Sequence, residues 1–245
     1  MINIVIPMAG LGSRFSNAGF IKPKPFIDVL GLPMIERVIQ NLEVDDTKFY
    51  LIAQEEHITK ESELVNYLKS KYNVVFLPIT KLTEGTACTV LYAKRYIDNN
   101  SPLIIANSDQ IVDISIKDFI QDSFDKCNDG HILTFIDKSK NNKWSFVKKD
   151  EDGNVVDVKE KIPISEEATV GIYFFSKGSS FVDSAIQMII ENNRVNNEFY
   201  TCPVYSYMIN NGMKIGTYEI PIDSMNGIGT PEDLEKYIFK INNTQ

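Results

Sequence analysis

The sequence of 245 residues has few of the side chains on which several common kinds of protein chemistry depend. It contains only two histidines, His57 and His131, which argues against a histidine base and against a cluster of histidine metal ligands. The three cysteines stand far apart without a CxxC pair, so neither a disulfide framework nor a zinc knuckle is indicated. The chemistry is therefore expected to depend on lysine, arginine and aspartate.

Long apolar runs and an excess of positive charge are also missing. No stretch approaches the roughly 18 apolar residues that a bilayer span needs. Met1 leads directly into a strand-like segment without a signal-peptide pattern. The formal net charge of -8 argues against a broad surface for DNA or RNA. We therefore expect a cytoplasmic protein that binds neither membranes nor nucleic acid and holds any anionic ligand locally.

Short apolar runs alternate with helical patterns through the first 110 residues. The run 2–8 is typical of a buried strand, and the apolar spacing of residues 33–42 predicts a helix with Pro33 in its first turn. The further expected elements are strand 49–53, helix 55–70, strand 74–77, helix 86–96 and strand 103–106. Alternation of this kind predicts an α/β fold with a mostly parallel central sheet flanked by helices.

Beyond residue 130 the pattern is mainly strand-like. Asp152 and Gly153 indicate a hairpin turn, because both residue types tolerate positive φ. The expected elements are strands 132–136, 144–148, 155–159, 170–175 and 214–220, and helices 179–192, 200–210 and 231–241. A chain of this length is near the upper size of one hydrophobic core, so we expect residues 1–245 to form a single domain with a hairpin-rich second half.

The segment PMAGLGSRFSNAGFIKPKP, residues 7–25, is the most informative for ligand binding. It follows the first strand, and ligands gather at the carboxyl ends of strands in parallel α/β sheets. Gly10 and Gly12 let backbone N–H groups approach phosphate oxygens, and Ser13 adds a hydroxyl donor. The cations of the segment are Arg14, Lys22 and Lys24. An isolated GxG would indicate only a turn, whereas glycines and cations together favour an anion cradle.

Two better-known phosphate loops differ from this segment. A Walker loop requires GxxxxGK followed by Ser or Thr, and the sequence contains no such string. A dinucleotide fingerprint requires GxGxxG, but Phe15 stands at the third glycine position. A variant Rossmann site in an NAD(P)-binding oxidoreductase remains open as the alternative from another enzyme class.

The strings GLGSRF, KPKPF and GLPMIERVI resemble the opening of the sugar-phosphate nucleotidyltransferase family. Four more segments resemble the family's nucleobase, metal, acceptor-phosphate and terminal-helix segments: EGTA at 84–87, NSDQ at 107–110, KEK at 159–161 and GTPEDL at 229–234. The resemblance implies a Rossmann-like, GT-A-like fold. It also implies that about residues 1–110 bind the nucleotide and about residues 111–245 bind the acceptor.

Within that family the sequence is most similar to cytidylyltransferases that serve surface-polysaccharide decoration, in particular the CTP:phosphoglutamine type of capsule phosphoramidate synthesis. This resemblance implies that CTP is joined to L-glutamine phosphate with Mg²⁺ as cofactor, giving a CDP-linked glutamine and pyrophosphate. A sugar-1-phosphate cytidylyl-, uridylyl- or thymidylyltransferase remains the alternative of the same class. A catalytically silent nucleotide-binding regulator also remains open.

By resemblance, the β- and γ-phosphates contact Gly10, Gly12 and Ser13. Arg14 stabilises the departing pyrophosphate and Lys24 reaches the α-phosphate, although Lys22 can compete for that role from sequence alone. The implied nucleotide site also includes Ala9, Gln54, Gly85 and Thr86. An acceptor phosphate is already largely ionised at pH 7, its second pKa being about 6, so no strong general base is required.

Gly85 and Thr86 belong to the segment that approaches the nucleobase by resemblance, and EGTA is equally compatible with a simple helix start. If the nucleobase is recognised near Gly85, a bulkier residue at position 85 is expected to lower nucleotide affinity more than folding stability.

Asp109 follows the expected strand 103–106, and a carboxylate there suits magnesium that bridges phosphates. Considered alone, Asp109 would be assigned to a turn or a helix cap, and the family resemblance favours the metal role. Gly227 occupies the position where the family often has a second metal aspartate. Three possibilities remain open: Asn226 as second ligand, Asp223 as second ligand, or Asp109 alone.

The acceptor residues implied by the resemblance are Lys161 for the phosphate and Gly171 for close backbone approach. Glu198, near Tyr200, is a further candidate that would contact an ammonium or hydroxyl group of the acceptor. A solvated lysine and a bulge glycine are the ordinary alternatives for the first two. Self-association remains open, since an apolar stripe on the C-terminal helix more often packs on its own core. The residues of that region are Lys236, Tyr237, Phe239 and Ile241.

Overall fold

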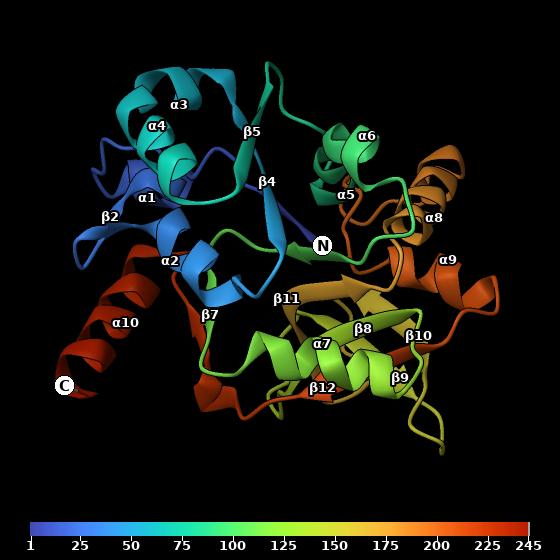
Figure 1. Cartoon of the computed structure of the whole chain (residues 1–245). Helices are drawn as coiled ribbons and strands as arrows, with labels where there is room; N and C mark the ends of the chain where they lie inside the picture. Colours follow the sequence, from blue (N-terminus) through green and yellow to red (C-terminus); the bar gives the residue numbers. More distant parts are fainter. Residues whose placement is uncertain (245) are drawn as a thin grey trace.

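The computed structural model describes residues 1–244, and the side chains of residues 1–243. Nine strands form the central sheet: β1 (Ile2–Pro7), β4 (Thr47–Gln54), β5 (Val74–Ile79), β6 (Leu103–Ala106), β8 (Gly130–Ile136), β9 (Ser145–Lys149), β10 (Val155–Glu160), β11 (Glu167–Phe175) and β12 (Ile215–Glu219). Their order is β10-β9-β11-β6-β1-β4-β5, and β8 lies between β11 and β12 (Figure 1).

Two small two-stranded sheets lie outside the central one. They pair β2 (Asp28–Val29) with β3 (Leu32–Pro33), and β7 (Gln110–Val112) with β13 (Met225–Gly227). The helices are α1 (Ser13–Asn17), α2 (Met34–Leu42), α3 (Glu55–Lys60), α4 (Ser62–Lys71), α5 (Thr86–Val90), α6 (Lys94–Ile97), α7 (Ile116–Asp125), α8 (Gly178–Ile190), α9 (Val204–Asn210) and α10 (Pro231–Thr244).

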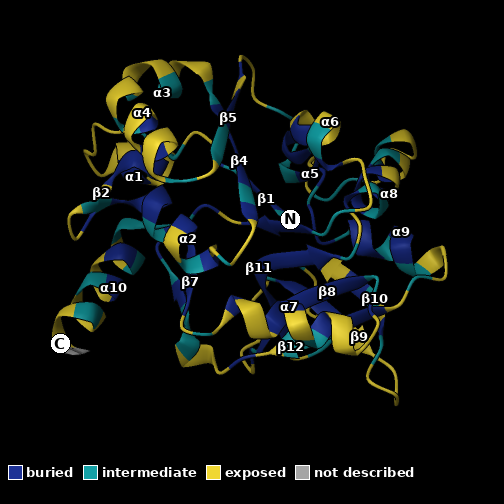
Figure 2. Ribbon diagram, viewed as in Figure 1, coloured by how far each residue is buried: buried dark blue, intermediate teal, exposed yellow. Residues whose placement is uncertain are grey.

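The first half of the sheet is parallel, as the alternating pattern predicts. β1 pairs in parallel with both β4 and β6, and β4 pairs in parallel with β5. Apart from Asn3, β1 is apolar without alternation because both of its faces are covered: Ile4 and Ile6 enter one core, whereas Val5 enters the other. The strands are accordingly the most deeply buried part of the chain (Figure 2).

Helices cover the sheet in two layers. The apolar faces of α2, α4, α7 and α10 contribute to the core on one face of the sheet. The apolar faces of α5, α6, α8 and α9 contribute to the core on the other face. The carboxyl ends of β1 and β6 therefore open between two helical layers.

The second half extends the sheet through antiparallel strands. β11 pairs antiparallel with β6, and β9 and β10 form the expected hairpin. In its turn, the Asp150 N–H donates to the Asn154 carbonyl (2.9 Å), and Gly153 has a φ of +84°. β8 pairs with β11 and, in parallel, with β12, which no local sequence signal predicts.

Several predicted helices differ from the observed ones. The predicted helix 55–70 is broken at Glu61 into α3 and α4, and the predicted helix 86–96 is divided into α5, a 3-10 turn and α6. α1 and α7 were not predicted, and α9 begins at Val204 instead of residue 200. Pro33 immediately precedes the first helical residue of α2. Such short segments are set by their tertiary contacts, since isolated turns have little intrinsic stability.

The C-terminal helix mostly packs on the chain's own core. Tyr237 is 8% exposed and Ile241 packs against the same core, whereas Phe239 is 72% exposed. Within residues 1–244, no helix has both the length and the apolar character of a membrane span.

His131 predicts a pH dependence of stability. It is buried beside Asn128, and its Nε2 lies 2.9 Å from the Asp122 carboxylate. Burial lowers its pKa to about 4, from an ordinary value of 6.5, and Asp122 offsets only part of this effect. As the pH falls, His131 is therefore protonated at a higher pH in the unfolded chain than in the folded chain. We expect the free energy of unfolding to fall by up to about 3 kcal/mol between pH 6.5 and 4.

Urea denaturation across this pH range measures the effect, and His131→Gln provides the comparison. If the wild type and the variant lose stability equally between pH 6.5 and 4, His131 is not the responsible group.

Candidate active site

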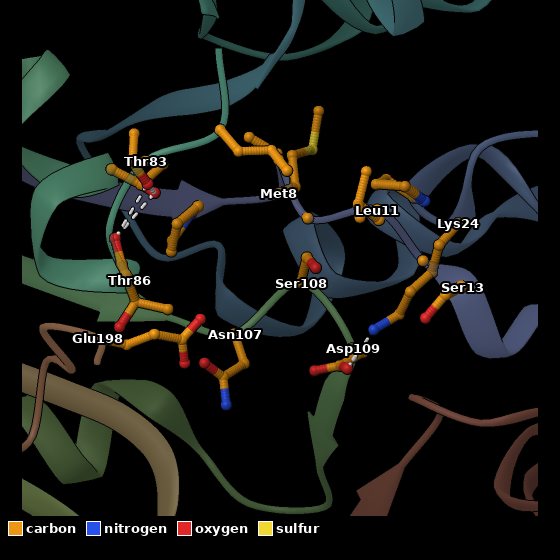
Figure 3. A pocket seen from close by; sticks show the side chains of 18 of the residues that line it. Met8, Leu11, Ser13, Lys24, Thr83, Thr86, Asn107, Ser108, Asp109 and Glu198 are labelled. Carbon is orange, nitrogen blue, oxygen red and sulfur yellow. Dashed lines mark hydrogen bonds and ion pairs between the residues drawn. The ribbon is translucent and has the colours of Figure 1, made fainter. Parts of the chain in front are cut away.

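A cleft of about 620 Å³ opens at the carboxyl ends of β1 and β6 (Figure 3). The residues that line it come from both halves of the chain: Pro7 to Arg14, Lys24, Pro25, Leu82, Thr83, Gly85, Thr86, Thr89, Asn107, Ser108, Asp109, Glu198 and Tyr200. The structure therefore brings together most of the residues that the sequence singled out. Gln54, Lys161 and Gly171 are not among the lining residues.

The loop after β1 offers a row of unpaired backbone donors. In the described part of the chain, the N–H groups of Gly10, Leu11, Gly12, Ser13 and Arg14 have no hydrogen-bond partner. Successive free N–H groups at the end of a strand form a concave site for anions. The sequence prediction of an anion cradle thus has a geometric counterpart in this loop.

Gly12 is required where it stands for two reasons. Its φ is +62°, a left-handed conformation that favours glycine, and it immediately precedes α1. A Cβ at this position would lie 3.0 Å from the Cβ of Lys24. The loop and the Lys24 segment can therefore pack closely, and the ammonium of Lys24 is brought to the loop's open side.

Lys24 and Asp109 both line the cleft and form an ion pair there (Figure 3). Lys24 begins a 3-10 turn whose next residues, Pro25 and Phe26, are buried, so the backbone on which Lys24 stands is anchored. Lys22, two residues earlier, is exposed and does not line the cleft. The tertiary structure therefore separates the two lysines that the sequence left in competition.

Asp109 is suited to Mg²⁺ chemistry, but only with help from a ligand. Within residues 1–244, no group of three or more His, Cys, Asp or Glu side chains is placed to hold a metal. Mg²⁺ commonly binds through one or two carboxylates, with substrate phosphates and water as the remaining ligands. The donor set fits that mode, because Asp109 lies in the same cleft as the unpaired N–H groups.

The backbone around Asp109 holds the carboxylate in place. The Ile228 N–H donates to the Asp109 carbonyl (2.9 Å). A Cβ at Gly229 would lie 2.5 Å from the Asp109 Oδ2, so a larger residue there would displace the carboxylate from this position. The start of the GTPEDL segment thus packs directly against the candidate metal ligand.

The side chain of Asn226 and the backbone of Asp223 contact Lys240 and not the cleft. The Asn226 carbonyl oxygen accepts from Lys240 (2.8 Å), and the Asn226 amide donates to Asp113 (3.0 Å). The main-chain carbonyl of Asp223 also accepts from Lys240, and neither Asn226 nor Asp223 lines the cleft. Of the three possibilities, this arrangement favours Asp109 as the sole side-chain ligand.

Gly85 is held tightly against the chain that carries Glu198. Its φ is +125°, and a Cβ would lie 2.4 Å from the Phe199 carbonyl oxygen. The Thr86 hydroxyl accepts from the backbone N–H of Thr201 (3.1 Å). Gln54 lies behind the loop, where its side-chain amide donates to the Ala9 carbonyl (2.8 Å).

The expectation that a bulkier residue at position 85 affects affinity more than stability therefore needs correction. In Gly85→Ala, the new Cβ meets the backbone of Phe199, which cannot move as a flexible side chain would. We expect a loss of about 3 kcal/mol or more in the free energy of unfolding. Urea denaturation measures it.

Gly212→Ala is the matched control, since its φ is +76° and nothing lies within 4 Å of its Cβ position. We expect this control to cost only about 1 kcal/mol. Equal losses in the two variants would mean that the Phe199 contact is unimportant.

Two of the three acceptor residues expected from the sequence, Lys161 and Glu198, are joined by hydrogen bonds through Tyr200. Lys161 donates to the Tyr200 hydroxyl (2.6 Å), and that hydroxyl donates to the Glu198 carboxylate. Burial lowers the pKa of Lys161, but Tyr200 and nearby carboxylates outweigh it, so the pKa lies above its ordinary value. Lys161 therefore remains charged beside Tyr200, and both Tyr200 and Glu198 line the cleft.

The sequence interpretation missed several lining residues. Asn107 and Ser108 lie within the NSDQ string, but only Asp109 was singled out there. Thr83 and Thr89 share a hydrogen bond of 2.6 Å beside Gly85. Position directly after a buried strand was the available signal for Asn107. Nothing local marked the two threonines, since their approach depends on α5.

Comparisons with known proteins agree with this geometry. The model of the family described as Nucleotidyl transferase matches residues 4–241. The Bifunctional protein GlmU of Methanococcus aeolicus is 24% identical over 249 aligned positions, covering 95% of this chain and 53% of that protein. The chain spans about half the length of the curated relatives it matches.

Solved structures share the GT-A-like fold. The nucleoside-diphosphate-sugar pyrophosphorylase from Vibrio cholerae RC9 superposes with a TM-score of 0.82 at 23% identity, covering 96% of this chain and 99% of that one. The inositol-1-phosphate CTP transferase from T. maritima gives 0.76 at 14% identity, covering 98% and 94%. Because the family model matches nearly the whole length, this chain belongs to the nucleotidyl transferase family.

Proposed function

We propose that the chain is a cytidylyltransferase that joins CTP to a small phosphorylated metabolite and releases pyrophosphate. L-glutamine phosphate is the preferred acceptor, and the product is a CDP-linked glutamine for modification of capsular polysaccharide. The observation that carries the transferase chemistry is the loop of unpaired N–H groups, residues 10–14, which shares one cleft with the Lys24–Asp109 pair. The choice of CTP and glutamine phosphate is supported by sequence resemblance.

In the proposed reaction, an oxygen of the acceptor phosphate attacks the α-phosphorus of CTP. A new P–O bond forms, the bond between the α-phosphorus and the bridging oxygen breaks, and that oxygen leaves with pyrophosphate. The attacking oxygen is already ionised near pH 7, so the protein has to align the two phosphates and offset their charge.

The side chains divide this work along the cleft. The N–H groups of the loop and Arg14 bind the β- and γ-phosphates, and Lys24 contacts the α-phosphate as negative charge develops there. Asp109 would hold Mg²⁺, which supplies positive charge to the phosphates when bound. Glu198, Tyr200 and Lys161 bind the acceptor. By this proposal, about residues 1–110 mainly bind the nucleotide and about residues 111–245 mainly bind the acceptor, in the cytosol.

The name of one structural neighbour, an inositol-1-phosphate CTP transferase, is compatible with CTP as substrate. The name of another, a nucleoside-diphosphate-sugar pyrophosphorylase, keeps a sugar phosphate as the second candidate acceptor. The match to the nucleotidyl transferase family argues against the alternative of an NAD(P)-binding oxidoreductase. A silent regulator would bind the nucleotide without releasing pyrophosphate.

Pyrophosphate release in the presence of Mg²⁺ tests the proposal. CTP, UTP, dTTP, ATP and GTP are each combined with glutamine phosphate, glucose 1-phosphate and phosphocholine. Release with CTP and glutamine phosphate above all other pairs is expected. Release only with UTP or dTTP and glucose 1-phosphate would replace the proposed substrates, and tight CTP binding without release would favour the regulator.

A further inference from the structure

One polar side chain in the cleft has hydrogen-bonding groups that the fold does not use. Asn107 directly follows β6, is exposed, and lies between Glu198 and Asp109 in the view of Figure 3. No hydrogen bond among the described residues involves its side-chain amide. A carboxamide offers two donors and an acceptor oxygen, so this group is available to a ligand.

Gly171 explains why the Asn107 side chain takes this position. Gly171 has a φ of +94° and lies where the register between β8 and β11 shifts, between Thr169 and Tyr173. Its carbonyl accepts the Asn107 backbone N–H (3.1 Å). A Cβ at position 171 would lie 2.2 Å from the Asn107 Nδ2. The room left by the missing side chain is therefore filled by the Asn107 amide.

The charges in the cleft indicate which substrate lies beside Asn107. Among the described lining residues, the charged ones are Arg14, Lys24, Asp109 and Glu198. The first three adjoin the loop of unpaired N–H groups, where the triphosphate is proposed to bind. Glu198 belongs to the second half of the chain and accepts a hydrogen bond from Tyr200. A ligand group that contacts Asn107 therefore lies beyond the phosphates, toward the acceptor.

We propose that the Asn107 side chain hydrogen-bonds to the acceptor and contributes to its selection. Gly171 is a positioning residue that acts through Asn107. Asn107 contacts a hydroxyl or amino substituent on the carbon skeleton next to the acceptor phosphate, since a carboxamide can hydrogen-bond to either group. This inference rests on the proposed nucleotidyl transfer, but it does not depend on CTP being the nucleotide.

Steady-state kinetics of Asn107→Ala test the first part, with the acceptor that gives the fastest pyrophosphate release. We expect the KM for the acceptor to rise about 10-fold, as for one lost hydrogen bond at a ligand. The kcat and the KM for the nucleotide stay within about 2-fold of wild type. Asn107→Ser, which keeps a polar group, recovers part of the loss. A rise in the nucleotide KM alone would overturn the assignment.

A double-mutant cycle tests the role of Gly171. Gly171→Ala should displace the Asn107 side chain and raise the acceptor KM in the same way. The double variant Asn107→Ala/Gly171→Ala should then be no worse than the poorer single variant, because both changes remove one contact. Gly153→Ala controls for backbone cost, with φ +84° and nothing within 4 Å of the Cβ position. Additive losses would show that Gly171 does not act through Asn107.

A binding measurement separates failure of this inference from failure of the proposed function. The side-chain NH₂ resonances of Asn107 are identified by NMR from their loss in Asn107→Ala. Glucose 1-phosphate, phosphoethanolamine and glutamine phosphate are each added with Mg²⁺ and a non-hydrolysable CTP analogue. A saturable shift with at least one acceptor is expected. Unchanged resonances with all three overturn the inference, whereas missing pyrophosphate release counts against the proposed function.

Discussion

Lys24→Ala is expected to lower kcat by about 100-fold or more, which is the usual cost of removing one preorganised charge from a transition state. The Lys24 ammonium lies in the cleft beside Asp109, on a backbone anchored by the buried Pro25 and Phe26. It is thus fixed where charge develops on the α-phosphate in the proposed reaction. Pyrophosphate release with saturating substrates measures kcat.

Folding should be little affected by this change. The Lys24 and Asp109 side chains remain 18% and 25% exposed, so water can solvate the remaining carboxylate. We expect the melting temperature of Lys24→Ala to stay within a few degrees of wild type, consistent with a ΔΔG below about 1 kcal/mol.

Lys22→Ala is the matched control, because Lys22 has the same charge, is two residues away and is exposed outside the cleft. It should keep near-wild-type turnover. Comparable turnover in Lys24→Ala and wild type would remove Lys24 from the mechanism. A large loss in Lys22→Ala instead would exchange the roles of the two lysines.

Asp109→Asn is expected to raise the Mg²⁺ concentration for half-maximal activity by at least about 10-fold and to lower kcat at fixed Mg²⁺ by a similar or larger factor. A neutral amide oxygen is a poorer ligand for a hard divalent cation than a carboxylate. Since the structure offers no second carboxylate at Gly227 and turns Asn226 toward Lys240, little compensates for the loss. Pyrophosphate release over a Mg²⁺ series measures both quantities.

Asp113→Asn provides the control for Asp109→Asn. Asp113 lies four residues further along, but it is paired with Lys240 and does not line the cleft. Its Mg²⁺ dependence should match that of the wild type. If Asp109→Asn responds to Mg²⁺ as the wild type does, Asp109 is not the metal ligand.

Much of the fold was predictable because its signals are local. The mostly apolar run of β1 predicted a strand buried on both faces, and the alternation of strands and helices that follows predicted parallel pairing with β4 and β6. Asp152 and Gly153 predicted the hairpin because both residue types tolerate positive φ. In the structure the φ of Gly153 is indeed positive. The short helices were mispredicted because their ends depend on packing partners elsewhere in the chain, as at Glu61 between α3 and α4.

In the candidate site, too, features set by adjacent residues were predictable, whereas contacts between distant segments were not. The sequence by itself determined the glycine-rich loop and the strand-end aspartate, because positive φ at Gly12 and the position after β6 are properties of adjacent residues. Only the tertiary structure decided that Lys24, and not Lys22, meets Asp109. It also decided that Asn107 fills the space above Gly171. These contacts join segments far apart in the sequence, so their geometry depends on how the sheet and its two helical layers pack.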